Sequence, residues 1–208
     1  MKVISLRKAD IEKLFSCSLW KSVRMDEHLV DGHFVVDVSL TEEMLITAMV
    51  IGGRITQYDE EHNFSKAGTF TGSYKADVGG LYGTLAAAAY ICRNWLKALD
   101  SINIRKGADE GDLHIGSKVI DVKNRLEAWH NKLMIPERQW LKRKFDAYVS
   151  CNIVKENAET VVRLWGYVTK EDLEKKGKWD DFGHGPTLTM PFIELSDIRE
   201  LLGKSSTT

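Results

Sequence analysis

The chain has 208 residues, of which 43% are hydrophobic and 28% charged, and its formal net charge at pH 7 is -1. This composition is that of an ordinary globular protein with a full core, and it excludes a protein that holds nucleic acid by overall charge alone. The sequence has no apolar run long enough to span a bilayer and no cleavable signal pattern at Met1-Lys2-Val3, so we expect one main domain in the cytoplasm.

Residues 1–75 are predicted to form a mostly helical N-terminal extension. Apolar residues recur at helical spacing from Ala9 to Val23 and again from Thr41 to about Glu60, and a short strand is expected over 34–38. Residues 60–77 are rich in Gly, Ser, Thr and Asn, which predicts a loop.

The clearest predicted helix runs from Gly79 to Leu99, where an alanine run would allow close packing against a sheet. A hairpin should follow, with its turn at Gly116-Ser117. Alternation, capping residues and glycine stops predict the remaining elements: strands over 146–154, 161–168 and 188–193, helices over 169–177 and 196–202, a loop over 179–186 and a frayed tail over 204–208.

The order helix, hairpin, strand, strand, helix indicates a mixed α/β fold, with an α+β-like mixed sheet flanked by helices. We expect this core to span 76–203. The three cysteines, Cys17, Cys92 and Cys151, are widely spaced in apolar or amphipathic segments, which predicts buried, reduced thiols and no disulfide framework or zinc ribbon.

The hairpin carries the most informative residues of the chain. Counting outward from the turn, Leu113 faces Ile120, and Asp112 then falls directly opposite Asp121. Two carboxylates at facing positions, with Cβ atoms roughly 5 Å apart, destabilise a hairpin unless a cation compensates them. Side chains alternate along a strand, so Lys123 should lie on the same side as Asp121.

Two interpretations of this cluster stay open. The first is a divalent-metal site on oxygen ligands; the second is a solvated hairpin face with an incidental charge cluster. The same acid-x-lysine spacing occurs in Glu174-Lys175-Lys176, in a predicted helix, so the spacing alone is not diagnostic.

The segment from Lys118 to Lys144 is locally positive, with eight basic residues against three acids. Such a zone beside a carboxylate pair is expected in a protein that attracts a polyanion and holds a metal against one of its phosphates. A solvated basic face is the alternative interpretation.

These residues resemble the PD-(D/E)xK nuclease superfamily, in particular its small archaeal, bacterial and phage members. Three features carry the resemblance, which covers about 77–202: the small-residue helix over 78–86, the two motif halves Gly111-Asp112-Leu113 and Ile120-Asp121-Val122-Lys123, and the strands over 146–154 and 161–168. The resemblance implies a restriction-endonuclease-like core and metal-dependent cleavage of DNA, including branched DNA, with RNA as an alternative substrate.

Within this resemblance, Mg²⁺ or Mn²⁺ would be held by Asp112, Asp121 and the backbone carbonyl of Val122. Lys123 would orient or deprotonate the attacking water, or stabilise the transition state as a cation. Nuclease activity on both strands would favour a homodimer. Six further residues are candidates for nucleic-acid contacts: Asn124, Arg125, Gln139, Lys142, Arg143 and Lys144.

One departure weakens the analogy with active members of the superfamily. The preceding helix commonly supplies a metal-directed Glu, and Thr84 occupies the matching position, although Asp77, Asp109 or Glu110 could substitute. The alternative function is therefore a catalytically impaired nuclease-fold protein that binds nucleic acid or a protein partner. A hydrolase of small phosphorylated molecules is a third possibility.

Two sets of residues have competing interpretations. Four tryptophans, at positions 129, 140, 165 and 179, could stack on bases, but buried packing is the commoner fate of this side chain. His28, His33 and His114 raise the option of a zinc site, but they show no recognised ligand spacing.

Overall fold

The structure is a computed structural model that describes residues 23–61, 74–101, 112–142, 145–155, 159–183 and 185–203. The helix expected over 9–23 lies outside these residues except for its last position. Most of the loop expected over 60–77, the tail at 204–208 and Cys17 also lie outside them.

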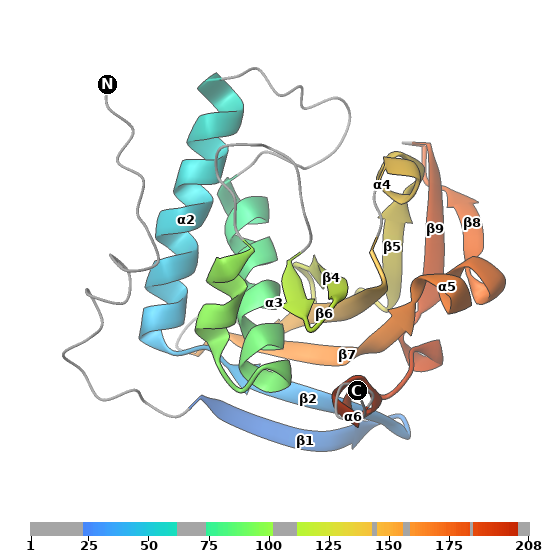
Figure 1. Cartoon of the computed structure of the whole chain (residues 1–208), viewed down its shortest axis with the longest axis horizontal. Helices are drawn as coiled ribbons and strands as arrows, with labels where there is room; N and C mark the ends of the chain where they lie inside the picture. Colours follow the sequence, from blue (N-terminus) through green and yellow to red (C-terminus); the bar gives the residue numbers. More distant parts are fainter. Residues whose placement is uncertain are drawn as a thin grey trace.

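A six-stranded mixed sheet forms the centre of the protein (Figure 1). Its order is β1-β2-β7-β6-β4-β3, and every neighbouring pair is antiparallel except β4 and β6. The strands are β1 (Arg24–Val30), β2 (His33–Ser39), β3 (Leu113–Ile115), β4 (Lys118–Arg125), β6 (Ala147–Lys155) and β7 (Val161–Thr169).

Two long helices, α2 (Glu42–Glu61) and α3 (Tyr74–Ile91), lie on one side of this sheet, with α2 packed on α3 (Figure 1). The alanine run at 86–89 in α3 is 0 to 2% exposed, as its small side chains predicted. The helix ends at Ile91 and not at Leu99, because Arg93 adopts a φ of 52° and Asn94 caps a separate 3-10 helix, η1 (Trp95–Asp100).

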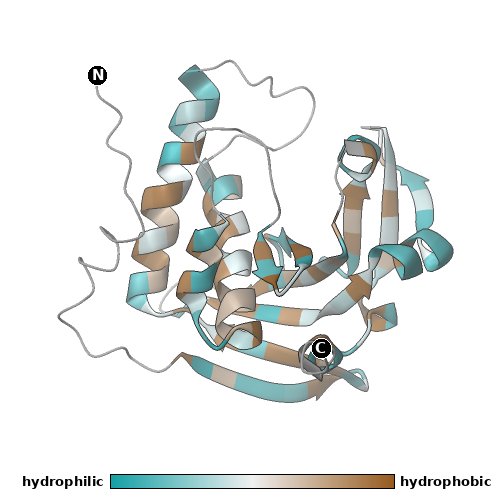
Figure 2. Ribbon diagram, viewed as in Figure 1, coloured by the Kyte–Doolittle hydropathy of each residue, from teal (hydrophilic) through white to brown (hydrophobic). Residues whose placement is uncertain are grey.

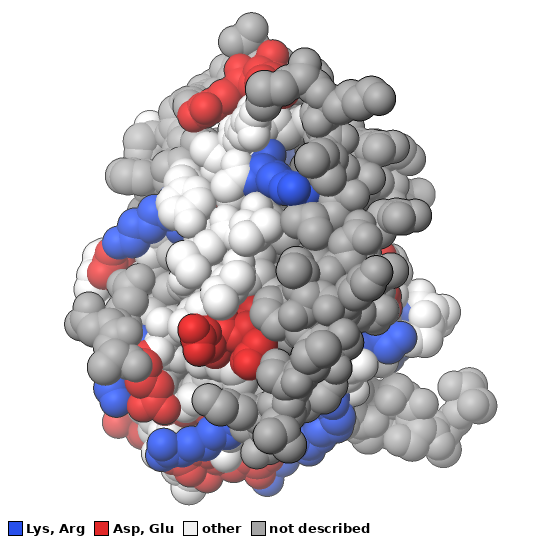
Figure 3. Space-filling view, turned by 90° about the vertical axis from the view of Figure 1, so that its left-hand side faces the viewer, with Lys and Arg blue, Asp and Glu red and all other residues white. Residues whose placement is uncertain are grey.

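The outer face of α2 leaves three large apolar side chains between 39% and 42% exposed: Ile46, Met49 and Val50. Figure 3 shows this side of the molecule, where uncharged side chains form a strip between scattered acidic and basic groups. Lysine and arginine do not gather here, so this view does not contain the basic zone predicted beside the hairpin.

A second, three-stranded sheet covers the opposite side of the central sheet (Figure 1). Its order is β5-β9-β8, and its core joins side chains of β6 and β7. Two of its strands were not predicted, because β5 and β8 are short and pair only with the distant β9. The elements are β5 (Lys132–Pro136), α4 (Glu137–Lys142), α5 (Lys170–Lys176), β8 (Lys178–Asp181), β9 (Pro186–Pro191), η2 (Phe192–Glu194) and α6 (Ile198–Gly203).

The first third of the chain departs from the mostly helical extension that was predicted for it. Residues 24–39 form the hairpin β1-β2, and β2 pairs with β7 in the central sheet. The strand β1 escaped prediction because it lies at the sheet edge and is mostly hydrophilic (Figure 2). Val36, Val38 and Met44 share a core with α3, so this segment packs together with the elements that follow it.

Several local predictions are confirmed. The strands β6 and β7 lie within two residues of their expected bounds, and Thr169 and Gly177 cap α5. The last helix is capped by Asp197, whose Oδ1 accepts from the Arg199 N–H, and not by Ser196 as expected. The protein is thus mixed α/β, with a mixed sheet flanked by helices. No helix in the described residues is long and apolar enough to cross a membrane.

Candidate functional site

The hairpin β3-β4 has the register that was predicted from its turn. Leu113 pairs with Ile120, His114 with Val119 and Ile115 with Lys118, around a positive-φ Gly116. Asp112 directly precedes β3, and its N–H donates at 2.9 Å to the carbonyl of Ile120, the residue that pairs with Leu113. The paired register ends at Leu113 and Ile120 and does not include the predicted pair of Asp112 and Asp121. The two carboxyl groups nevertheless lie together, because they share a side-chain hydrogen bond.

The Asp112 side chain takes the place of a backbone acceptor in this ladder. Its Oδ2 accepts from the Val122 N–H at 2.7 Å. In an extended strand the N–H and C=O of one residue point to the same edge, so the Val122 carbonyl also lies on the Asp112 side of β4. Two of the three oxygen donors proposed for the metal, Asp112 and the Val122 carbonyl, thus lie on the same edge of β4.

Asp121 and Lys123 form a buried ion pair on one face of β4. Lys123 Nζ lies 2.6 Å from Asp121 Oδ2, and their side chains are 19% and 2% exposed. The ion pair with Lys123 is therefore the interaction that compensates the buried Asp121 Oδ2. Ile120 and Val122 point to the opposite face and into the core with α3, as the alternation predicted.

The Asp112 carboxyl is perturbed by its surroundings. Burial, the Asp121 charge and a side-chain hydrogen bond with Asp121 together raise the pKa of Asp112 to about 7, against the opposing effects of Lys123 and the Val122 N–H. A metal-free protein therefore holds Asp112 partly protonated near neutral pH. A divalent cation would favour the ionised form of both acids.

The face of β4 that carries Asp121 and Lys123 continues to Arg125, and it gathers buried polar atoms that lack partners. Ser150 pairs with Lys123 in the parallel register of β4 and β6, so its side chain lies on this face, and it is fully buried. Among the described residues, four buried atoms without a hydrogen bond belong to this face or to the segments around it: Arg125 Nε, His130 Nδ1, Gln139 Oε1 and Ser150 Oγ. Native proteins leave few such atoms, so this face is a candidate site for a polar ligand.

Arg125 is a partly buried cation. Burial lowers the pKa of its guanidinium, and no carboxylate within the described parts of the chain forms an ion pair with it. Burial, and after it the positive charge of Arg125, lowers the pKa of His130.

Other predicted site residues are not brought to this face. Asn124 points to the opposite side, where its Nδ2 donates to the Gly79 carbonyl in α3, so its side chain is not on the face of Lys123 and Arg125. Lys142 ends α4 and its side chain is not described, and Arg143 and Lys144 lie outside the described residues.

The helix α3 does not supply a third acid. It packs through Gly79 and Gly83 on the Asn124 face of β4, and Thr84 Oγ1 donates to the Gly80 carbonyl. Asp77 accepts a hydrogen bond from Thr56 in α2, and Asp109 and Glu110 lie outside the described residues. Among the residues that the structure describes, no group of three or more His, Cys, Asp or Glu is arranged to hold a metal.

The predicted zinc-binding histidines and base-stacking tryptophans lie in different parts of the structure. His114 bonds with Ser101, and His28 and His33 lie on β1 and β2, far from the hairpin in the sheet order. Trp140 stacks on Tyr148 and Trp165 on Phe192, whereas Trp129 and Trp179 are 75% and 50% exposed. Cys92 and Cys151 are free thiols, as expected.

Sequence reasoning missed Ser150 and His130 as neighbours of the site. Ser150 sits in a fully buried strand, where a small polar residue among apolar ones was the only available signal. His130 follows an exposed tryptophan in a segment with no clear pattern.

Comparison with protein-family models finds no match for this chain. Comparisons with curated proteins and with solved structures find no match either. The geometry of the site therefore carries the functional argument.

Proposed function

We propose that the protein is a Mg²⁺- or Mn²⁺-dependent phosphodiesterase that hydrolyses DNA. The single observation that carries the proposal is the pair of interacting acids, Asp112 and Asp121, with Lys123 against the second of them. The resemblance of this motif to PD-(D/E)xK nucleases supports the choice of substrate.

The residues present fit a hard divalent cation. Asp121 is buried and held against the Lys123 ammonium, and Asp112 together with the Val122 carbonyl would add further oxygen ligands beside it. Mg²⁺ prefers such ligands and commonly needs only one or two carboxylates besides water and substrate phosphate. When bound, it would polarise the phosphoryl oxygen and lower the pKa of a water ligand.

Lys123 and Arg125 provide the positive charge of the proposed reaction. The Lys123 ammonium neutralises Asp121 in the free protein and would turn to the phosphate, where it orients the water or stabilises the growing negative charge. Arg125, two residues further along the same face, would bind a neighbouring phosphate. Both cations are partly buried, and the lower local dielectric constant strengthens their attraction for an anion.

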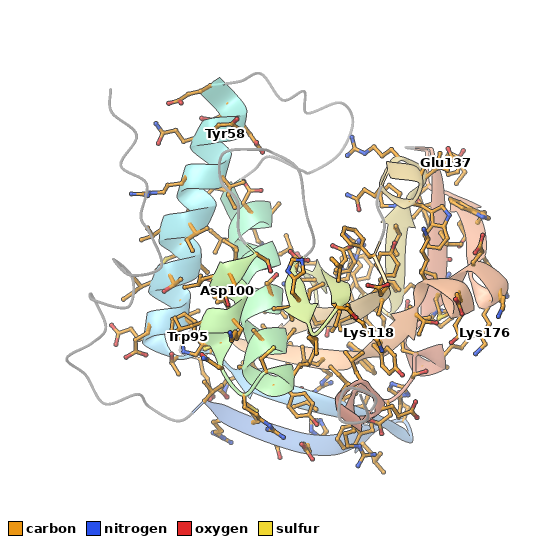
Figure 4. The ribbon with its side chains drawn as sticks, in the orientation of Figure 1. Tyr58, Trp95, Asp100, Lys118, Glu137 and Lys176 are labelled. Carbon is orange, nitrogen blue, oxygen red and sulfur yellow. The ribbon has the colours of Figure 1, made fainter. Side chains whose placement is uncertain are left out.

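The test is incubation of plasmid and branched DNA with Mg²⁺ or Mn²⁺. Asp121→Asn and Lys123→Met should each abolish cleavage. The chain offers a matched control in Glu174→Gln and Lys176→Met, which alter the same acid-x-lysine spacing on the exposed surface of α5. Figure 4 labels Lys176 on α5 and Lys118 at the start of β4, well separated from each other.

If wild-type protein does not cut any of these substrates, or if Asp121→Asn cuts as well as wild type, the proposal is wrong. Gel filtration with light scattering tests the proposed homodimer separately.

A second candidate is a nuclease-fold protein that binds nucleic acid or a protein partner without cutting it. The observation that favours it is Thr84 in place of an acid, together with the lack of a third carboxylate among the described residues near Asp121. A salt-sensitive gel shift without turnover would support this function.

A further inference from the structure

The segment after β4 presents an exposed aromatic ring. Trp129 is 75% exposed, the highest value among the large hydrophobic side chains of the described residues. Its ring contacts that of His130, with centroids 4.0 Å apart. An indole that is neither packed in the core nor covered by a described element offers an open face for stacking.

The backbone around Trp129 is anchored to the end of the polar face. Asn152 Nδ2 donates to the Ala128 carbonyl at 3.1 Å and reaches the His130 carbonyl at 3.5 Å. Asn152 pairs with Arg125 in the register of β4 and β6, and its Oδ1 accepts from Trp165 Nε1 at 2.8 Å. The backbone carbonyls of Ala128 and His130, on either side of Trp129, thus both accept hydrogen bonds from Asn152, which lies next to Arg125 in the sheet.

The Arg125 guanidinium is suited to bind a phosphate at this end of the face. It is desolvated, its Nε is unpaired, and the described residues provide no carboxylate partner. A buried cation without a counter-ion is costly, and an anionic ligand removes that cost. Along β4 the spacing from Lys123 to Arg125 is about 6.6 Å and from Asp121 to Arg125 about 13 Å. Successive phosphates of an extended strand could therefore follow this face.

We propose that Arg125 and Trp129 form a subsite for one nucleotide of an unpaired DNA strand, with the guanidinium on its phosphate and the indole stacked on its base. This inference rests on the proposed function and specifies its substrate. A base inside a duplex is covered on both faces by its neighbours, so an indole stacks only on a base that is unpaired or at a strand end. The net charge of -1 agrees with a protein that does not hold duplex DNA by charge alone.

The test is equilibrium binding without metal, so that it does not depend on cleavage. Fluorescence anisotropy compares a labelled single-stranded oligothymidine with a labelled duplex of equal length, both in EDTA. Stacking is worth about 1 to 3 kcal/mol per base, so Trp129→Ala should weaken single-strand binding roughly 5- to 150-fold. Trp129→Phe should restore most of the affinity, and duplex binding should not change.

Two further variants control this test. Trp179→Ala removes an exposed tryptophan from β8, in the second sheet, and should bind like wild type. Arg125→Lys should weaken single-strand binding because a lysine cannot form the same forked contact. Circular dichroism should show that each variant is folded.

The inference is overturned if Trp129→Ala binds the single strand like wild type, if it loses single-strand and duplex affinity equally, or if the wild type binds neither DNA. Cleavage that depends on Asp121 but not on Trp129 would leave the proposed function intact and remove only this subsite. Conversely, Trp129-dependent binding without cleavage would retain the subsite and favour the non-catalytic alternative.

Discussion

The substitution Asp112→Asn should make the metal-free protein more stable than wild type in alkaline solution but not in acid. Asparagine keeps the shape of the side chain, and its amide oxygen can still accept from the Val122 N–H. It cannot ionise, however, so it avoids the cost of placing a second negative charge beside Asp121 in a poorly hydrated position.

The direction of this stability change with pH follows from the pKa of Asp112, which burial and the neighbouring Asp121 raise from 3.8 to about 7. Between these two values the folded protein holds a proton that the unfolded chain has lost. The stabilisation from this proton is fully present below about pH 4 and is lost as the pH rises through about 7. The wild-type protein should therefore lose stability over this range, and the variant should not.

The size of the change in unfolding free energy follows from the same pKa shift. About three pKa units correspond to about 4 kcal/mol in total, of which about 3 kcal/mol is lost between about pH 5 and pH 8.5. This value is an upper limit, because Asp112 is not fully buried. For a chain of this size, a loss of about 3 kcal/mol lowers the melting temperature of the wild type by roughly 6 to 12 °C relative to that of Asp112→Asn.

Thermal and urea denaturation in EDTA, followed by circular dichroism at the two pH values, measures this difference. Glu174→Gln, an exposed acid on α5, should show no pH-dependent difference from wild type. Added Mn²⁺ should stabilise the wild type at the higher pH and leave Asp112→Asn unchanged. If the stability difference between wild type and Asp112→Asn is the same at both pH values, Asp112 does not share a desolvated site with Asp121, and the reasoning fails.

Four further substitutions test local packing, capping and hydrogen bonding. Gly83→Ala should cost about 1 to 3 kcal/mol in urea unfolding, because a Cβ would lie 2.7 and 2.8 Å from side chains of β4 and β6. Gly80→Ala, on the same helix with open space around it, should instead stabilise by about 0.5 to 1 kcal/mol. Thr169→Ala removes the N-cap of α5 and should cost about 1 kcal/mol in the same assay. Asn152→Ala should cost about 1 to 3 kcal/mol and also weaken single-strand binding, because it releases the Trp129 segment and leaves the Trp165 N–H without its acceptor.

The features that could be predicted depend on neighbours in the chain. A two-residue turn sets the pairing on both sides of it, so Gly116-Ser117 was sufficient to predict that Leu113 pairs with Ile120 and that Asp112 and Asp121 lie close to each other. Alternation then placed Lys123 beside Asp121, and local capping placed the ends of α5. These relations act over a few residues and depend little on the rest of the fold.

The features that were missed depend on partners far along the chain. The strand β1 belongs to the central sheet because β2 pairs with β7, more than a hundred residues later. The strands β5 and β8 are short, β8 is also polar, and both exist because they pair with β9. The orientation of Asn124 was missed because the sequence does not show that α3 packs on that face of β4.

The sequence by itself determined the acid pair and its lysine, because a tight turn and the two-residue period of a strand are local geometry. Only the tertiary structure decided that this face is desolvated and that Ser150, His130 and Arg125 continue it. Burial depends on which distant elements cover a strand, and it is burial that raises the pKa of Asp112 and leaves Arg125 without a counter-ion among the described residues.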